Sequence, residues 1–79
     1  RLPGRGTAKP SVLLNHLDVV AAEAARWQHP RLAGAVADGY VHGRGAVDCK
    51  GVAVTEALAM IELARRGVTL DRDVLFLGT

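Results

Sequence analysis

Two short segments of this 79-residue chain carry side chains of the types that bind metal ions. The first, His16-Leu17-Asp18, follows the apolar run Val12-Leu13-Leu14 and places an imidazole and a carboxylate two residues apart. In an extended strand, this spacing puts both side chains on one face. The second places Asp48 in the glycine-rich stretch 43–51, just before a helical pattern. An imidazole and carboxylates that converge at strand ends predict a site for a metal such as zinc.

Apolar runs predict the strands that would position these residues. Residues 11–15 form a short apolar run and predict a buried strand. The continuous run 74–77 is typical of a strand that is buried on both faces. Between them, Asp38-Gly39 separates two short apolar pairs, which predicts a β-hairpin.

A helical pattern connects the glycine-rich stretch to the last strand. Residues 52–66 repeat apolar side chains every three or four positions, and Gly67 follows as the expected terminator. We expect the stripe Val54, Leu58 and Ile61 to face the core. A strand–helix–strand crossover makes the two outer strands parallel, so the chain is predicted to form an α/β layer with ligands at the carboxyl ends of its strands.

Composition argues against several other classes of protein. The net charge is +2 and the basic residues are dispersed without interleaved aromatic side chains, which gives nucleic-acid binding little support. No apolar run approaches the roughly 20 residues of a membrane span, and no signal peptide is visible. The single cysteine excludes an internal disulfide. We therefore expect a cytoplasmic protein without a membrane partner.

The two motifs together resemble a known family. The strings 13–20 and 38–51, with Trp27 between them, resemble the zinc-dependent exopeptidases and deacylases, which include acetylornithine deacetylase, succinyl-diaminopimelate desuccinylase, aminoacylase and glutamate carboxypeptidase. The resemblance implies that residues 1–79 are part of the catalytic, metal-binding domain. The chain would then be a fragment of a three-layer α/β domain with parallel strands, a crossover helix and a small hairpin. The remaining catalytic strands and the dimerisation or lid domain would lie outside it.

The resemblance also implies a role for each candidate residue. His16 matches the family's first zinc ligand, and Asp48 matches the carboxylate that bridges two zinc ions. Asp18 matches the catalytic-site carboxylate that orients the histidine ring. The peptide bond after the bridging aspartate is cis in the family, which predicts a cis bond between Asp48 and Cys49. The general base would be a glutamate beyond Thr79.

The implied activity is hydrolysis of an amide or peptide bond near a free carboxylate, by an exopeptidase or an N-acyl-amino-acid deacylase. The implied cofactor is zinc, as two ions in the complete protein, with cobalt or manganese as other metals. The implied partner is a small molecule or peptide with a free carboxylate, and the parent protein is compatible with a homodimer. Two alternatives stay open: a non-catalytic remnant with an incomplete metal site, and a nucleotide-binding βαβ unit.

Several residues also have a purely structural interpretation. His16 would be a buried histidine that bonds to Asp18 without a metal, and Asp48 would be the N-cap of the following helix. Arg44 is expected to be an ion-pair partner rather than a substrate clamp. Cys49 is expected to be a small residue rather than a ligand.

Two further histidines lie in predicted loops. His29 and His42 are expected to face solvent, and neither is predicted to be a ligand.

Overall fold

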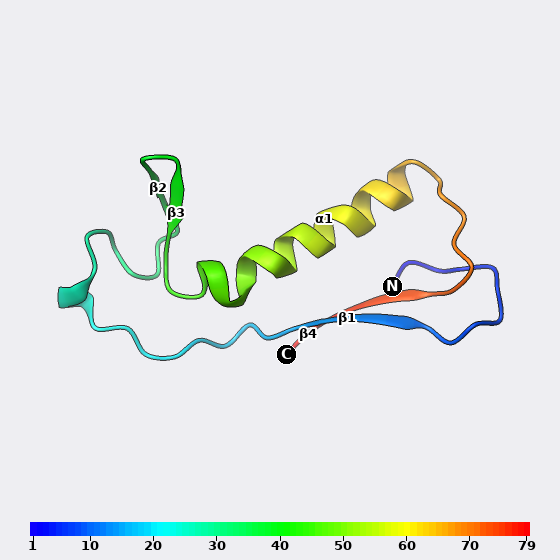
Figure 1. Ribbon diagram of the computed structural model, residues 1–79, viewed down its shortest axis with the longest axis horizontal. Helices are drawn as coiled ribbons and strands as arrows, with labels where there is room; N and C mark the ends of the chain where they lie inside the picture. The colour runs from blue at the N-terminus through cyan, green and yellow to red at the C-terminus, as the bar shows by residue number, and fades with distance from the viewer.

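Two parallel strands, β1 (Ser11–Asn15) and β4 (Val74–Gly78), form the centre of the computed structural model, which describes residues 1–79 (Figure 1). The register pairs Leu13 with Phe76 and Asn15 with Gly78. The crossover between the strands contains α1 (Gly51–Arg65), which packs against both of them. The predicted strand–helix–strand order and the parallel pairing are confirmed.

Only one face of this sheet is covered. Leu13 is half-buried on the face toward α1, whereas Val12 and Leu14, which point the opposite way, are exposed by 53% and 63%. In β4, Leu77 on the open face is also half exposed. The prediction that β4 is buried on both faces is therefore wrong for this structure, because no layer covers the second face.

The helix turns a different apolar stripe toward the sheet from the one predicted. Ala53 is its only fully buried residue, whereas Val54, Leu58 and Ile61 are largely exposed. The prediction that these three form the core is wrong because α1 has apolar side chains on two sides, and periodicity alone does not say which side packs.

The end of α1 follows the predicted pattern. Gly67 adopts a left-handed conformation with φ of 62°, its N–H donates to the Ala64 carbonyl, and the next N–H donates to Leu63. This is the Schellman arrangement, and it explains why the helix stops there.

The second sheet is the predicted hairpin of β2 (Ala35–Ala37) and β3 (Tyr40–His42). Both turn residues have positive φ, 51° at Asp38 and 80° at Gly39, which is the tight turn that matches the twist of a hairpin. A long segment with one short helical turn, η1 (Ala24–Arg26), connects β1 to the hairpin and extends away from the central strands (Figure 1).

The overall shape is elongated. The radius of gyration is 16.4 Å, whereas a compact domain of this length has about 12 Å. No helix in the structure combines the length and the apolar character that a membrane crossing requires.

Candidate metal centre

His16 follows the last residue of β1, at the carboxyl end of the sheet. Its Nδ1 lies 3.0 Å from the backbone carbonyl oxygen of Asp18 and 3.4 Å from Oδ1 of the same residue. Because a carbonyl oxygen only accepts, Nδ1 carries the proton and donates it there. In the neutral ring the other nitrogen, Nε2, then has the lone pair, and this is the form of histidine that binds metals.

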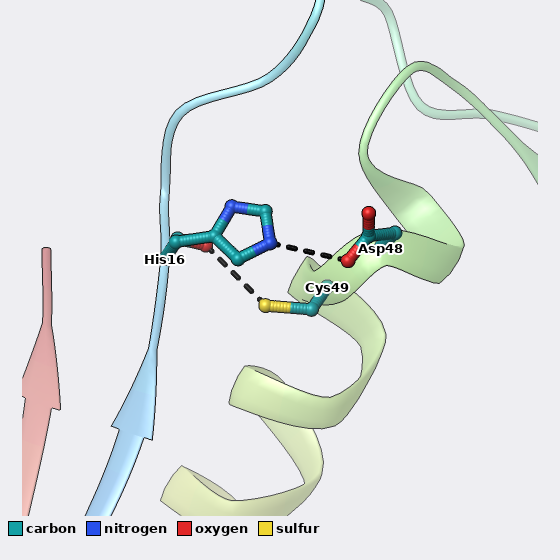
Figure 2. A group of neighbouring side chains, drawn as sticks. All are labelled: His16, Asp48 and Cys49. Atoms are coloured by element: carbon teal, nitrogen blue, oxygen red, sulfur yellow. Dashed lines mark hydrogen bonds and ion pairs between the residues drawn. The ribbon is translucent and has the colours of Figure 1, made fainter.

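Asp48 lies opposite this nitrogen. Its Oδ1 is 3.1 Å from Nε2 of His16, although the two residues are 32 positions apart in the chain (Figure 2). Asp48 belongs to η2 (Ala46–Lys50), an irregular turn that leads into α1, and the Asp48–Cys49 peptide bond is cis, as the resemblance implied. The N-cap position of α1 falls on Lys50. The carboxylate of Asp48 therefore faces His16 instead of capping the helix.

The contact between His16 and Asp48 needs a cation. With the ring proton on Nδ1, a lone pair of Nε2 faces a carboxylate oxygen, and two acceptors at 3.1 Å repel each other unless a proton or a metal ion joins them. Two hydrogen bonds raise the pKa of His16 above its usual value. The larger effect comes from the bond to the Asp18 carbonyl and the next from the bond to the Asp48 carboxylate. Two ligands of one tetrahedral zinc ion stand about 3.3 Å apart, so this donor pair fits zinc.

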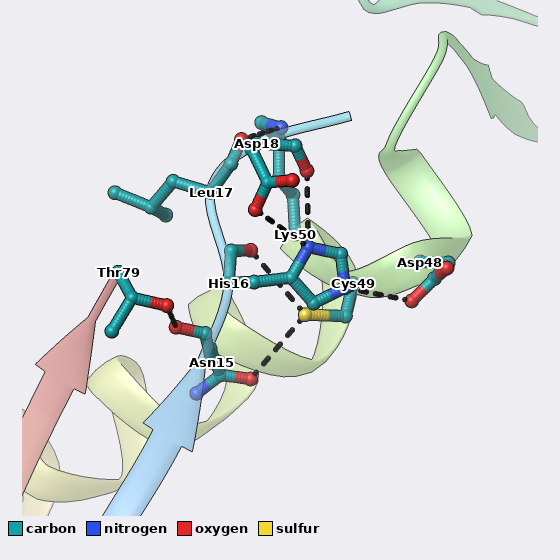
Figure 3. Close-up of polar contacts among 8 residues, drawn as sticks. All are labelled: Asn15, His16, Leu17, Asp18, Asp48, Cys49, Lys50 and Thr79. Carbon is teal, nitrogen blue, oxygen red and sulfur yellow. Dashed lines mark hydrogen bonds and ion pairs between the residues drawn. The ribbon is translucent and has the colours of Figure 1, made fainter. Parts of the chain in front are cut away.

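The shape of the turn depends on Gly45 and Lys50. Gly45 has a φ of 83°, and a Cβ atom at this position would come within 2.5 Å of the Val19 side chain. The ammonium group of Lys50 donates to the Leu17 carbonyl at 2.8 Å and ties the turn to the segment after β1 (Figure 3). The sequence interpretation missed this tie. A positive charge in the first turn of a helix is unfavourable because it opposes the helix dipole. The position of Lys50 therefore indicated that its ammonium group has another partner.

Cys49 is the third possible ligand in the cluster. Single donor atoms of Cys49, His16 and Asp48 all lie within 4.8 Å of one another. The thiol sulfur is also 3.5 Å from the His16 carbonyl oxygen and 3.8 Å from Oδ1 of Asn15. The thiol thus has hydrogen-bond acceptors of its own on the end of β1.

A pocket of about 160 Å³ opens beside this cluster. Its lining includes Val19, Val20 and Val47 in addition to His16, Asp18 and Asp48. The candidate metal-binding atoms therefore border a space that is open to a ligand.

Arg44 also lines the pocket, but it differs from the prediction. It forms no ion pair; instead its guanidinium lies 5.4 Å from the ring centre of Trp27, and its Nε is buried without a hydrogen-bond partner. The ion-pair role is wrong because the aromatic ring, and not a carboxylate, is the neighbour.

The two other histidines are not simply solvent-facing. The rings of His29 and His42 are 4.4 Å apart between centroids, both residues are half-buried, and Nε2 of His42 lies 3.2 Å from a carbonyl oxygen in β2. Packing of the hairpin against the preceding loop explains this burial. Neither ring joins the cluster around His16.

The chain thus combines a parallel α/β unit with an imidazole and a carboxylate that face each other beyond the carboxyl end of its first strand. Peptidase family M20/M25/M40 matches residues 12–79, and the chain therefore belongs to this family of metal-dependent hydrolases. No solved structure gives a significant match.

The curated relatives carry the name succinyl-diaminopimelate desuccinylase. The protein from Methylobacterium nodulans is 46% identical over 77 residues, which is 94% of this chain and 19% of the relative. The protein from Rhodopseudomonas palustris strain BisA53 is 40% identical over 77 residues, again 94% of this chain and 20% of the relative. The chain thus spans about a fifth of the length of these relatives.

Proposed function

We propose that this chain supplies two of the zinc ligands of a longer hydrolase that cleaves an amide bond near a free carboxylate. The observation that carries the proposal is the 3.1 Å separation between Nε2 of His16 and Oδ1 of Asp48. The similarity to desuccinylases favours a deacylase over an exopeptidase. Nothing in the geometry supports a nucleotide-binding unit.

Each residue of the centre has a separate task in this proposal. His16 donates Nε2 to the metal, and the Asp18 carbonyl and carboxylate hold the ring in the required tautomer. Asp48 turns Oδ1 toward His16, and its second oxygen, which takes no hydrogen bond, is available to a second ion. Bound zinc supplies Lewis acidity, which polarises a carbonyl group and activates water.

The proposal is tested in a hybrid desuccinylase, in which this chain replaces the matched segment of the Methylobacterium nodulans enzyme. We expect the hybrid to bind zinc and to release succinate from succinyl-diaminopimelate. His16→Ala and Asp48→Ala should each remove activity and lower the zinc content, whereas His29→Ala should change neither.

Full activity with either of the first two substitutions would contradict the proposal. A hybrid that has the circular dichroism and elution volume of the parent enzyme but no zinc would also contradict it. A second hybrid that carries only residues 11–51 of this chain covers the case in which the longer exchange does not fold. Failure of both hybrids to fold would count against the proposal, because the segment would then not be equivalent to that of the relatives.

A further inference from the structure

Asn15 is the only buried polar side chain in the structure, with 5% of its surface exposed. It is the last residue of β1 and directly precedes His16. Its backbone carbonyl accepts hydrogen bonds from the N–H and the hydroxyl of Thr79, at 2.9 and 3.3 Å (Figure 3). These bonds fix the backbone from which His16 projects.

The side-chain amide of Asn15 connects this strand end to the helix. Its Nδ2 donates to Oε2 of Glu56 in α1 at 2.6 Å. This is a charge-assisted hydrogen bond, which is about twice as strong as a neutral one. Because Nδ2 is committed to Glu56, the amide oxygen faces the other way, toward the thiol of Cys49 at 3.8 Å.

The same hydrogen bond therefore acts on both halves of the candidate metal centre. On one side is the residue next to His16, and on the other is the helix whose preceding turn carries Asp48. Apart from the contact between His16 and Asp48 themselves, the other side-chain ties from this strand end are the weak thiol contacts of Cys49 and the exposed Lys50 bond, which reach the turn before the helix. At 2.6 Å the Asn15–Glu56 bond is the shortest of these ties, and unlike the Lys50 bond it is partly buried.

We propose that Asn15 and Glu56 are a positioning pair that sets the separation of His16 and Asp48 and thereby the metal affinity of the centre. This inference rests on the proposed function. Neither residue contacts the metal; the pair acts through the placement of the two ligands. Loss of residues that orient metal ligands lowers metal affinity by about 10- to 100-fold.

The test compares variants of the hybrid desuccinylase. Asn15→Ala and Glu56→Ala should each lower zinc affinity by about 10- to 100-fold. The double variant should lose no more than either single one, because both substitutions remove the same bond. Glu56→Gln keeps an acceptor oxygen and should retain most of the affinity. The matched control is Glu62→Ala, which removes a carboxylate from the same helix that pairs only with Arg66.

Cobalt spectroscopy separates positioning from a purely structural role. At saturating Co²⁺, the visible absorption bands report the arrangement of the ligands. We expect these bands to shift in Asn15→Ala and Glu56→Ala and to stay unchanged in Glu62→Ala. Unchanged bands and affinity, with only a lower urea midpoint of the metal-free protein, would overturn the inference.

The outcomes also separate this inference from the proposed function. Unaltered zinc binding in the Asn15 and Glu56 variants, together with its loss in His16→Ala, would overturn the positioning pair alone. Retention of zinc in His16→Ala would overturn the proposed function. If Asn15→Ala does not fold, Glu56→Ala removes the same bond from a half-buried helix position and decides the question.

Discussion

The two ring nitrogens of His16 have different partners, and this division determines what the residue can bind. Nδ1 donates to the Asp18 carbonyl, so in the neutral ring the lone pair is on Nε2, the nitrogen that lies 3.1 Å from the Asp48 carboxylate. The sequence predicted that these three residues belong together, from the two-residue spacing and the glycine-rich stretch. It did not predict that the backbone oxygen of Asp18 lies nearer to the ring than the carboxylate, because that depends on how the chain bends after β1.

This geometry leads to a prediction for Asp18→Ala in the hybrid desuccinylase. The substitution removes the carboxylate oxygen that lies 3.4 Å from Nδ1 of His16. It leaves the backbone carbonyl oxygen at 3.0 Å from the same nitrogen, so the ring keeps its main partner. We expect zinc affinity to fall by about 10-fold, at the low end for a residue that orients a ligand. Zinc titration checks this, and a loss as large as that of His16→Ala would contradict it.

At the scale of elements, the sequence predicted the β1 segment, the hairpin turn and the end of α1 because each depends on local chemistry. A left-handed glycine ends the helix, and two residues with positive φ form the turn. The packed face of α1 was mispredicted because both of its apolar stripes satisfy the same periodicity. The ties that hold the centre, such as Asn15 to Glu56 and Lys50 to Leu17, join distant parts of the chain. Local patterns do not reveal such contacts.

The turn before α1 allows a matched comparison of two glycines. Gly45 and Gly39 have nearly the same φ, 83° and 80°, so alanine costs about 1–2 kcal/mol of backbone strain at each. A new Cβ meets Val19 and Lys50 at Gly45 but has nothing within 4 Å at Gly39. We therefore expect Gly45→Ala to lower both the urea midpoint and the zinc affinity of the hybrid. Gly39→Ala should lower only the midpoint, and equal zinc affinities for the two variants would contradict this account.

At the scale of the whole molecule, the structure brings together the residues of the candidate metal centre but has little buried core. Ala53 is its only buried apolar residue, and exposed apolar side chains occur on the open face of the sheet, on the outer stripe of α1, in the hairpin and in the segment after β1. The chain spans about a fifth of its curated relatives. The sequence predicted buried strands and a core-facing helix stripe from apolar patterns, but such patterns do not say which surfaces are covered. The three-layer arrangement of the parent domain stays a prediction.

This shape predicts the behaviour of the isolated 79-residue chain. Apolar burial is the main force that offsets the loss of chain entropy, and here it is small. We expect the ellipticity measured by circular dichroism to change gradually with temperature, without a cooperative transition. A sigmoidal transition together with dispersed amide resonances would contradict this expectation.

In the proposed function, His16 and Asp48 hold one metal ion between them. The most direct measurement is anomalous X-ray diffraction at the zinc edge from crystals of the hybrid desuccinylase. The account predicts a peak about 2.0–2.2 Å from both Nε2 of His16 and a carboxylate oxygen of Asp48. A zinc peak that involves neither residue, with His16 bonded directly to Asp48, would contradict it.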